Sequence, residues 1–237
     1  MSLIIYDSFD TWDPSKWDIK RNGGGRVTIS VVNGRLVFRD TSTEGAPAVA
    51  IIRSKQYFHL SKDRVQEVRV DVELPTPPAG FISHAAYFVI TPSSITENWA
   101  DDMYQIAFYT LSTGGWRVGV SAQKGGSTVF SCPAVTLNKN YGTLRYVVLN
   151  DEIAFYVDDT EICRDTYRLG SREVALWLET IMSGGCEVRW DNVAYIAPPP
   201  SEAPGGGLSQ ALQLVFQLLM VILPVILLVL LLTALIG

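Results

Sequence analysis

Acidic and apolar side chains alternate along residues 65–74, VQEVRVDVEL. Glu67, Asp71 and Glu73 fall on one face of an extended chain, and the valines fall on the other. Residues two apart on a strand lie about 6.6–7 Å from each other, so Asp71 and Glu73 resemble an acid and base pair. Arg69 lies among these acids, and we therefore favour a solvated face of a half-buried strand.

Other catalytic or metal-binding patterns are missing from the sequence. His59 and His84 have no serine or cysteine motif around them, and G-x-S-x-G, H-E-x-x-H and C-x-x-C do not occur. The glycine runs at 23–25 and 205–207 are not followed by Lys-Ser/Thr, so no phosphate-binding loop is predicted. The histidines are interpreted as structural or surface residues.

The elements that must position any site are strands. The composition favours strands and turns, and short runs with strand character recur between turn signals such as Asn33-Gly34 and Gly125-Gly126. The predicted strands lie at 26–32, 35–39, 48–53, 65–74, 81–91, 103–110, 116–122, 144–149, 152–158, 173–179 and 187–196. No segment before residue 208 has helical periodicity. We therefore predict an all-β, two-sheet antiparallel sandwich or a barrel over residues 1–197.

Charge and cysteine content narrow the possible partners. The net charge is -5, and no basic patch reverses it, so a nucleic-acid partner is not expected. The three cysteines, Cys132, Cys163 and Cys186, do not make a disulfide framework. One bridge, for example between Cys163 and Cys186, and free buried thiols both remain open.

The C-terminal segment has the character of a membrane span. Residues 208–236 carry no charged side chain and form roughly 44 Å of helix at about 1.5 Å per residue, enough to cross a bilayer. A buried core helix is the alternative, but core helices keep a polar stripe. We predict a Pro/Gly-rich linker at 198–207, a transmembrane helix at 208–237, and a lipid bilayer as partner.

Glutamines within the predicted span indicate self-association. Gln210, Gln213 and Gln217 recur at spacings of three and four, which places them on one helix face. A glutamine in lipid gains from hydrogen bonding to a neighbouring helix, so a homo-oligomer is predicted. Gln210 and Gln213 also fit the membrane interface, where they need no partner.

Both ends of residues 1–197, which we call the head, carry motifs that resemble a known family. YDSFDTWDPSKWDI, NGRLVFRD, VQEVRVDVEL and CEVRWDNVAYI occur in the order seen in concanavalin A-like lectin and glucanase domains of the laminarinase-like type. The resemblance implies a jelly roll of two curved antiparallel sheets. It also implies a concave face that binds glycans in many members and hydrolyses them in some.

The resemblance also predicts which positions carry catalytic acids and which could hold a calcium ion. The family's β-glucan-cleaving members carry E-x-D-x-x-E on one strand, but the corresponding run 103–109 has Gln105 and Ala107 where acids are expected. No cofactor is expected, apart from a possible structural calcium. By the resemblance, Asp191 and the Asp7–Asp10 segment, which includes Asp7, are candidates for holding that ion.

Aromatic side chains suggest a glycan platform. Tyr and Trp rings stack on sugar C–H faces while their polar edges reach hydroxyls. Trp99 lies in the polar loop SSITENWADD, and we predict a glycan-binding site of Trp99, Tyr104 and Trp116. The alternative is that these aromatics belong to the core.

The leading functional hypothesis is a non-enzymatic, membrane-anchored β-sandwich that displays a structural or recognition surface on a virion or cell envelope. Its expected partners are a glycan or a capsid or envelope protein. A glycan-binding, lectin-like receptor is the alternative, and a divergent glycoside hydrolase is the second. The N-terminus lacks signal-peptide features; the head is expected outside the virion or cell, and the cytosolic side stays open.

Overall fold

The structure is a computed structural model that describes residues 2–43, 45–97 and 101–198. The predicted linker beyond Pro198, the predicted span, and Gln210, Gln213 and Gln217 lie outside these residues. Within the described part of the chain, no helix is long and apolar enough to cross a membrane.

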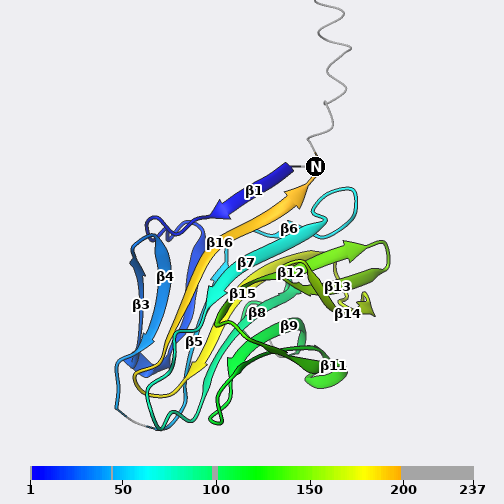
Figure 1. The fold of residues 1–237 in the computed structure, drawn as a ribbon. Coiled ribbons are helices and arrows are strands. Elements are labelled where there is room, and N and C mark those ends of the chain that lie inside the picture. Colours follow the sequence, from blue (N-terminus) through cyan, green and yellow to red (C-terminus); the bar gives the residue numbers. More distant parts are fainter. Residues whose placement is uncertain (1, 44, 98–100, 199–237) are drawn as a thin grey trace, which may run out of the picture. The chain divides into compact units, whose positions relative to one another are not determined.

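Two antiparallel eight-stranded sheets make up the described head (Figure 1). Sheet I runs in the order β14 (Thr160–Thr166), β13 (Glu152–Val157), β12 (Tyr141–Leu149), β7 (Glu67–Glu73), β16 (Glu187–Ala197), β4 (Arg35–Asp40) and β3 (Val27–Val32), with β1 (Ser2–Asp7) paired to β16. Sheet II runs in the order β11 (Ser127–Leu137), β10 (Trp116–Lys124), β9 (Asp102–Thr110), β8 (His84–Pro92), β15 (Glu173–Met182), β5 (Ala48–Ser54) and β2 (Trp17–Asn22), with β6 (Phe58–His59) paired to β15. This confirms the predicted all-β antiparallel sandwich.

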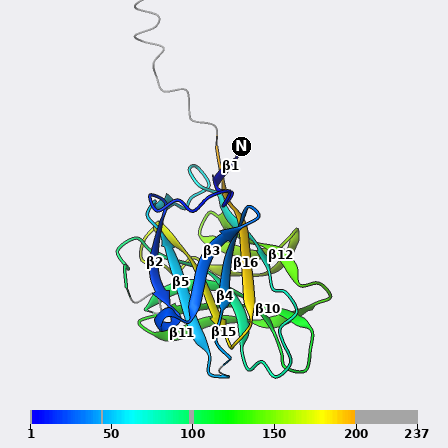
Figure 2. The same ribbon diagram turned by 90° about the vertical axis from the view of Figure 1, so that its left-hand side faces the viewer.

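The two sheets stack because each buries one face. In β7, Val68, Val70 and Val72 are almost completely buried, whereas Asp71 and Glu73 point outward and are half-buried. The same period of two recurs along β8, β9 and β15, so their inward residues form one core between the sheets. Where the sheets meet, β3 and β4 lie beside β2 and β5, as Figure 2 shows.

The turn residues confirm one local prediction in particular. Asn33 and Gly34 have φ values of 52° and 72° and join β3 to β4 as a tight hairpin. Both central positions of such a turn need positive φ, which is why Asn-Gly is favoured there.

Several strands escaped the sequence analysis, among them β2, β6, β11 and β14. Strands β2 and β11 are the two edges of sheet II and β14 is an edge of sheet I, while β6 has two residues and pairs with β15. An edge strand has fewer neighbours to bury it; β11 has no fully buried residue. Its alternation of apolar and polar residues is weak for that reason.

A disulfide joins two of these edges. Cys132 of β11 is bonded to Cys163 of β14, while Cys186 is free and buried. The Cys163–Cys186 bridge that the sequence left open is therefore not formed. Cys186 precedes β16 and packs into the core between the sheets, whereas Cys163 lies at the edge of sheet I.

Candidate functional site

The predicted glycan platform does not assemble. Tyr104 points inward from β9 and is fully buried; its hydroxyl donates to the carbonyl of Thr166 and accepts from the amide N–H of Arg168, both at 2.8 Å. Trp116 also points inward, at the rim of a separate pocket of about 320 Å³ with Pro78 and Phe81. Trp99 lies outside the described residues. Tyr104 is therefore a core residue, since inward positions of β9 face the second sheet.

The two predicted calcium ligands do not face one site. Asp7 is buried and accepts hydrogen bonds from the backbone N–H of Phe9 at 2.9 Å and the indole Nε1 of Trp17 at 2.8 Å. Asp191 lies on the outer face of sheet I, near Arg35. No group of three or more His, Cys, Asp or Glu side chains suited to a metal occurs among the described residues. Asp7 acts instead as a hydrogen-bond acceptor for the N-terminal segment.

A single carboxyl group occupies the centre of the outer face of sheet II. The alternation of β15 turns Leu176 and Leu178 into the core and Trp177 and Glu179 outward. Register then places Glu179 opposite Tyr87 of β8. On its other side Glu179 faces Ile51 of β5. The next residues along the same row are Arg21 of β2, beyond Ile51, and Ala107 of β9, beyond Tyr87.

Glu179 is an unpaired acid in an apolar setting. The residue is 2 % exposed, and its Oε2 has no hydrogen-bond partner. Burial raises the pKa of the Glu179 carboxyl to about 8, with Arg21 opposing the shift. Burial, followed by the charge of Glu179, also raises the pKa of the Tyr87 phenol. Glu179 is thus a carboxylic acid that holds its proton at neutral pH.

Polar and aromatic side chains extend this face across the neighbouring strands. Gln105 and Tyr109 of β9 point outward on either side of Ala107, and the Nε2 of Gln105 donates to the Oγ of Ser121 at 2.8 Å. These are the β9 positions where the sequence resemblance expects acids. The carboxyl group of this face therefore lies on β15, two strands away from β9 in the sheet.

The segment after β8 forms a wall at one end of this face. The Arg53 guanidinium donates to the carbonyl of Ser93 at 3.0 Å, and Ile95 packs against the cluster that includes Trp177. Glu97 then pairs at 3.1 Å with Lys20 of β2, the edge strand that lies beyond β15 and β5 from β8. The wall crosses the outer face next to the row that contains Glu179.

Sequence reasoning missed Glu179, although one signal was present. The run EVALWLETIM carries a charge at its exposed first residue, Glu173, and again at Glu179, deep within an otherwise uncharged and buried strand. A buried strand rarely carries an unpaired acid without a function, because burial penalises the charge. Several acids at alternate positions of one strand form a recognisable pattern, whereas a single acid such as Glu179 forms none.

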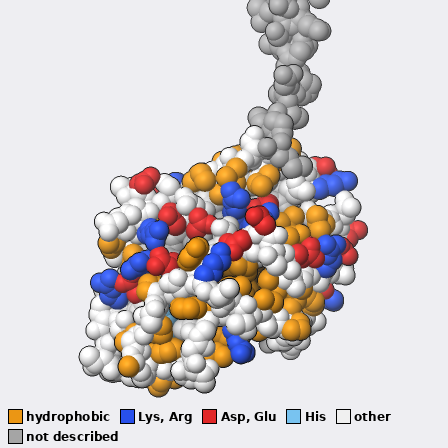
Figure 3. All heavy atoms as spheres, in the orientation of Figure 1, with side chains coloured by type: hydrophobic (Ala, Val, Ile, Leu, Met, Phe, Trp, Pro, Cys, Tyr) orange, Lys and Arg blue, Asp and Glu red, His pale blue; other side chains and the backbone are white. Residues whose placement is uncertain are grey.

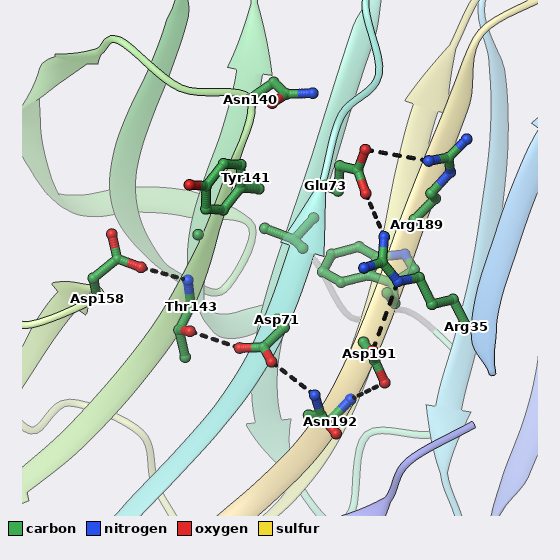
Figure 4. Close-up of a pocket in the computed structure, with 13 residues that line it drawn as sticks. Arg35, Asp71, Glu73, Asn140, Tyr141, Thr143, Asp158, Arg189, Asp191 and Asn192 are labelled. Carbon is green, nitrogen blue, oxygen red and sulfur yellow. Dashed lines mark hydrogen bonds and ion pairs between the residues drawn. The ribbon is translucent and has the colours of Figure 1, made fainter. Parts of the chain in front are cut away.

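A second candidate is an open pocket on the outer face of sheet I (Figure 4). It has a volume of about 640 Å³ and lies over β4, β7, β12 and β16. Asp71 accepts from Thr143 Oγ1 at 2.6 Å and from Asn192 Nδ2 at 3.0 Å. Glu73 pairs with Arg189 at 3.2 Å and with Arg35 at 2.5 Å. These acids do form a sheet face as the sequence suggests, but they are tied into a polar network.

Acidic and basic side chains alternate on the surface seen in Figure 3 and gather into no large patch of one sign there. Burial raises the pKa of Asp191, with the charges of Asp71 and Asp10 adding to the effect and Arg35 opposing it. The face seen in Figure 3 therefore has no large basic surface that could attract an acidic partner.

Comparison with solved structures defines the fold family. No protein-family model and no curated protein matches the sequence. The β-glucanase of Bacillus licheniformis is 12% identical, with a TM-score of 0.54 over 80% of this chain and 95% of that one. The laminarinase catalytic domain of Thermotoga petrophila is 12% identical, with a TM-score of 0.58 over 84% and 99%. The endo-β-1,3-glucanase of Pyrococcus furiosus is 14% identical, with a TM-score of 0.59 over 83% and 95%.

These matches correct the leading functional hypothesis. The head shares the concanavalin A-like jelly roll of glycoside hydrolases over most of its length. Both the prediction of a non-enzymatic display protein and the prediction that the chain is not an enzyme were wrong as the favoured interpretation. The non-enzyme prediction rested on the missing E-x-D-x-x-E strand and the lack of another catalytic pattern, and these say nothing about an acid supplied by another strand of the same face.

Proposed function

We propose that this protein is a divergent glycoside hydrolase, with Glu179 on the outer face of sheet II as its general acid. The observation that carries the proposal is the buried, unpaired Glu179 carboxyl, whose pKa of about 8 keeps it protonated at neutral pH. The fold shared with β-glucanases and a laminarinase supports this assignment.

Glu179 has the proton that glycosidic bond cleavage requires. As the bond between the anomeric carbon and the leaving oxygen breaks, Glu179 gives its proton to that oxygen, and water supplies the new hydroxyl group at the anomeric carbon. The carboxylate left behind is stabilised by Arg21 and regains a proton from solvent. The attacking water releases one proton as it bonds to the anomeric carbon. Because the cross-strand neighbours of Glu179 are Ile51 and Tyr87 and not a second carboxylate, that proton passes to solvent.

The other groups of the face have positioning roles in this proposal. Tyr87 and Tyr109 offer rings for stacking on pyranose C–H faces, and Gln105 offers an amide to sugar hydroxyls. The wall formed by residues 93–97 limits the face on one side, where Ile95 packs against the cluster that contains Ile51 and Trp177. Limited water access is what keeps the carboxyl neutral.

The test measures reducing-sugar release from laminarin and from barley mixed-linkage β-glucan by the full chain in detergent. Glu179→Gln is expected to lower kcat by about 10²–10⁴, because it removes the proton donor while keeping the shape of the side chain. Glu173→Gln, on the exposed start of the same strand, is the matched control and keeps wild-type activity.

Two outcomes contradict the proposal. One is a wild-type chain that releases no reducing sugar from either glucan at any pH between 4 and 9. The other is a Glu179→Gln enzyme as active as the Glu173→Gln control.

A further inference from the structure

The geometry points to a second, non-catalytic binding site for uncharged glycans, in the pocket on the outer face of sheet I shown in Figure 4. This site lies on the sheet opposite Glu179 and does not depend on the proposed hydrolysis. We call it the Asp191 pocket, after one of the residues that line it. Its volume of about 640 Å³ is suited to a short stretch of sugar units.

The register of three strands builds the floor of the Asp191 pocket as two rows. Arg189 of β16, Glu73 of β7 and Tyr141 of β12 form the first row. Asp191 and Asp71, with Thr143 of β12, form the second row. Side chains directly opposite on neighbouring strands have Cβ atoms about 4.5–5.5 Å apart, so the polar groups of each row can contact one ligand together.

The polar groups of the floor are held in place before any ligand arrives. Asp71 is fixed from both sides by Thr143 and Asn192. Asn192 itself has a φ of 46° at the β-bulge that follows Asp191. A bulge re-aims side chains, and a positive φ at a residue other than glycine costs free energy that binding sites often retain. Here it turns the Asn192 amide toward Asp71, as Figure 4 shows.

Several groups remain available to a ligand. Oδ1 of Asp191 accepts from the Asn192 N–H, but the nearest cation to its Oδ2 is Arg35 Nε at 3.8 Å, beyond hydrogen-bond distance. The side chain of Asn140 and the hydroxyl of Tyr141 have no hydrogen bond to the described residues. The Tyr141 ring is 56% exposed, and Lys139 Nζ lies 4.7 Å from its centroid.

This combination selects a class of ligand. An exposed tyrosine ring beside planar carboxyl, amide and guanidinium groups offers both stacking and paired hydrogen bonds to vicinal hydroxyls. The lining carries the carboxyl groups of Asp71, Glu73, Asp158 and Asp191 against two guanidiniums, those of Arg35 and Arg189. The excess of negative charge disfavours uronic and other acidic sugars, so the ligand is an uncharged glycan.

The experiment is an amide NMR titration of the full chain in detergent micelles, with Glu179→Gln as the background to prevent hydrolysis. The probe is laminaritetraose, and alginate tetrasaccharide is its acidic counterpart. Laminaritetraose is expected to shift the amide signals of Thr143 and Asn192. Adding Tyr141→Ala or Asp191→Asn is expected to weaken this binding at least tenfold.

The control is Tyr156→Ala on the same sheet. Tyr156, like Tyr141, has a cation over its ring, in this case the guanidinium of Arg145 at 5.2 Å, but it lies outside the pocket. This variant is expected to bind laminaritetraose as the background protein does.

The readout separates this inference from the proposed hydrolysis. Shifts at Ala107 and Gly119 report the face that contains Glu179, whereas shifts at Thr143 and Asn192 report the Asp191 pocket. The inference is overturned if Thr143 and Asn192 do not shift, if Tyr141→Ala and Asp191→Asn bind as tightly as Tyr156→Ala, or if alginate binds there at least as tightly as laminaritetraose. None of these outcomes bears on the activity of Glu179.

Discussion

At the scale of single residues, the burial of Glu179 lowers the stability of the folded chain near neutral pH, while it keeps the carboxyl protonated for the proposed reaction. A glutamate with an ordinary pKa of 4.5 loses its proton well below neutral pH, but burial holds the pKa of Glu179 at about 8. Between these two values the folded chain binds a proton that the unfolded chain does not. The free energy of unfolding therefore falls as pH rises from about 4.5 to about 8, by about 1.4 kcal/mol per pH unit for this group.

We expect Glu179→Gln to remove this pH dependence. Relative to wild type, the variant should gain stability as pH rises, by up to about 3 kcal/mol between pH 4.5 and pH 7, because an amide does not ionise. Urea unfolding at pH 4.5, 6, 7 and 8 measures the difference. A constant difference between the two proteins over this range would show that Glu179 ionises normally in the folded chain.

At the scale of elements, the edges of the sandwich depend on a covalent link more than on burial. The strand β11 has no fully buried residue, and β14 has one, Asp165. The Cys132–Cys163 bond joins these two edges across a sequence separation of 31. A crosslink of this loop length restricts the unfolded chain and so raises the free energy of unfolding.

Replacing both Cys132 and Cys163 by serine should lower the free energy of unfolding by about 2–4 kcal/mol. Cys186→Ala provides the comparison, because Cys186 is a free, buried thiol and its loss breaks no disulfide. Thermal unfolding with and without reductant checks the prediction. Reductant should lower the Tm of wild type and of Cys186→Ala, and leave the double serine variant unchanged; an equal Tm in all conditions would contradict it.

At the scale of the whole molecule, the head and the C-terminal segment pose separate questions. The head shares its fold with a β-glucanase and with a laminarinase catalytic domain, over nearly the full length of each. The uncharged segment 208–236 lies outside the described residues, so its membrane insertion stays a prediction from the sequence. The same holds for the homo-oligomer attributed to Gln210, Gln213 and Gln217.

We expect the full chain to float with liposomes in a density gradient and a chain ending at Pro198 to stay in the soluble fraction. The physical reason is the free energy gained by burying residues 208–236 in the hydrocarbon core. Gln217→Leu should keep flotation but weaken self-association in detergent, which crosslinking measures. A full chain that remains unbound would remove the predicted anchor, whatever the head does.

The sequence by itself determined the class of the fold. Alternation such as that of Val68, Val70 and Val72, together with turn signals such as Asn33-Gly34, is local information, and a half-buried strand needs nothing else to be recognised. The same local information showed that Gln105 and Ala107 replace acids on one strand. Local information did not reveal edge strands such as β11, because a strand with little buried surface shows only weak alternation.

Only the tertiary structure decided which residues meet. Glu179 became a candidate acid because β15 lies between β8 and β5, and these neighbours bury its carboxyl beside Tyr87 and Ile51. Cys132 is bonded to Cys163 because two sheet edges that are distant in sequence come together. The Asp191 pocket likewise needs strand pairings far apart along the chain. Burial, pKa and pocket shape are properties of such long-range contacts, so no local pattern in the sequence carries them.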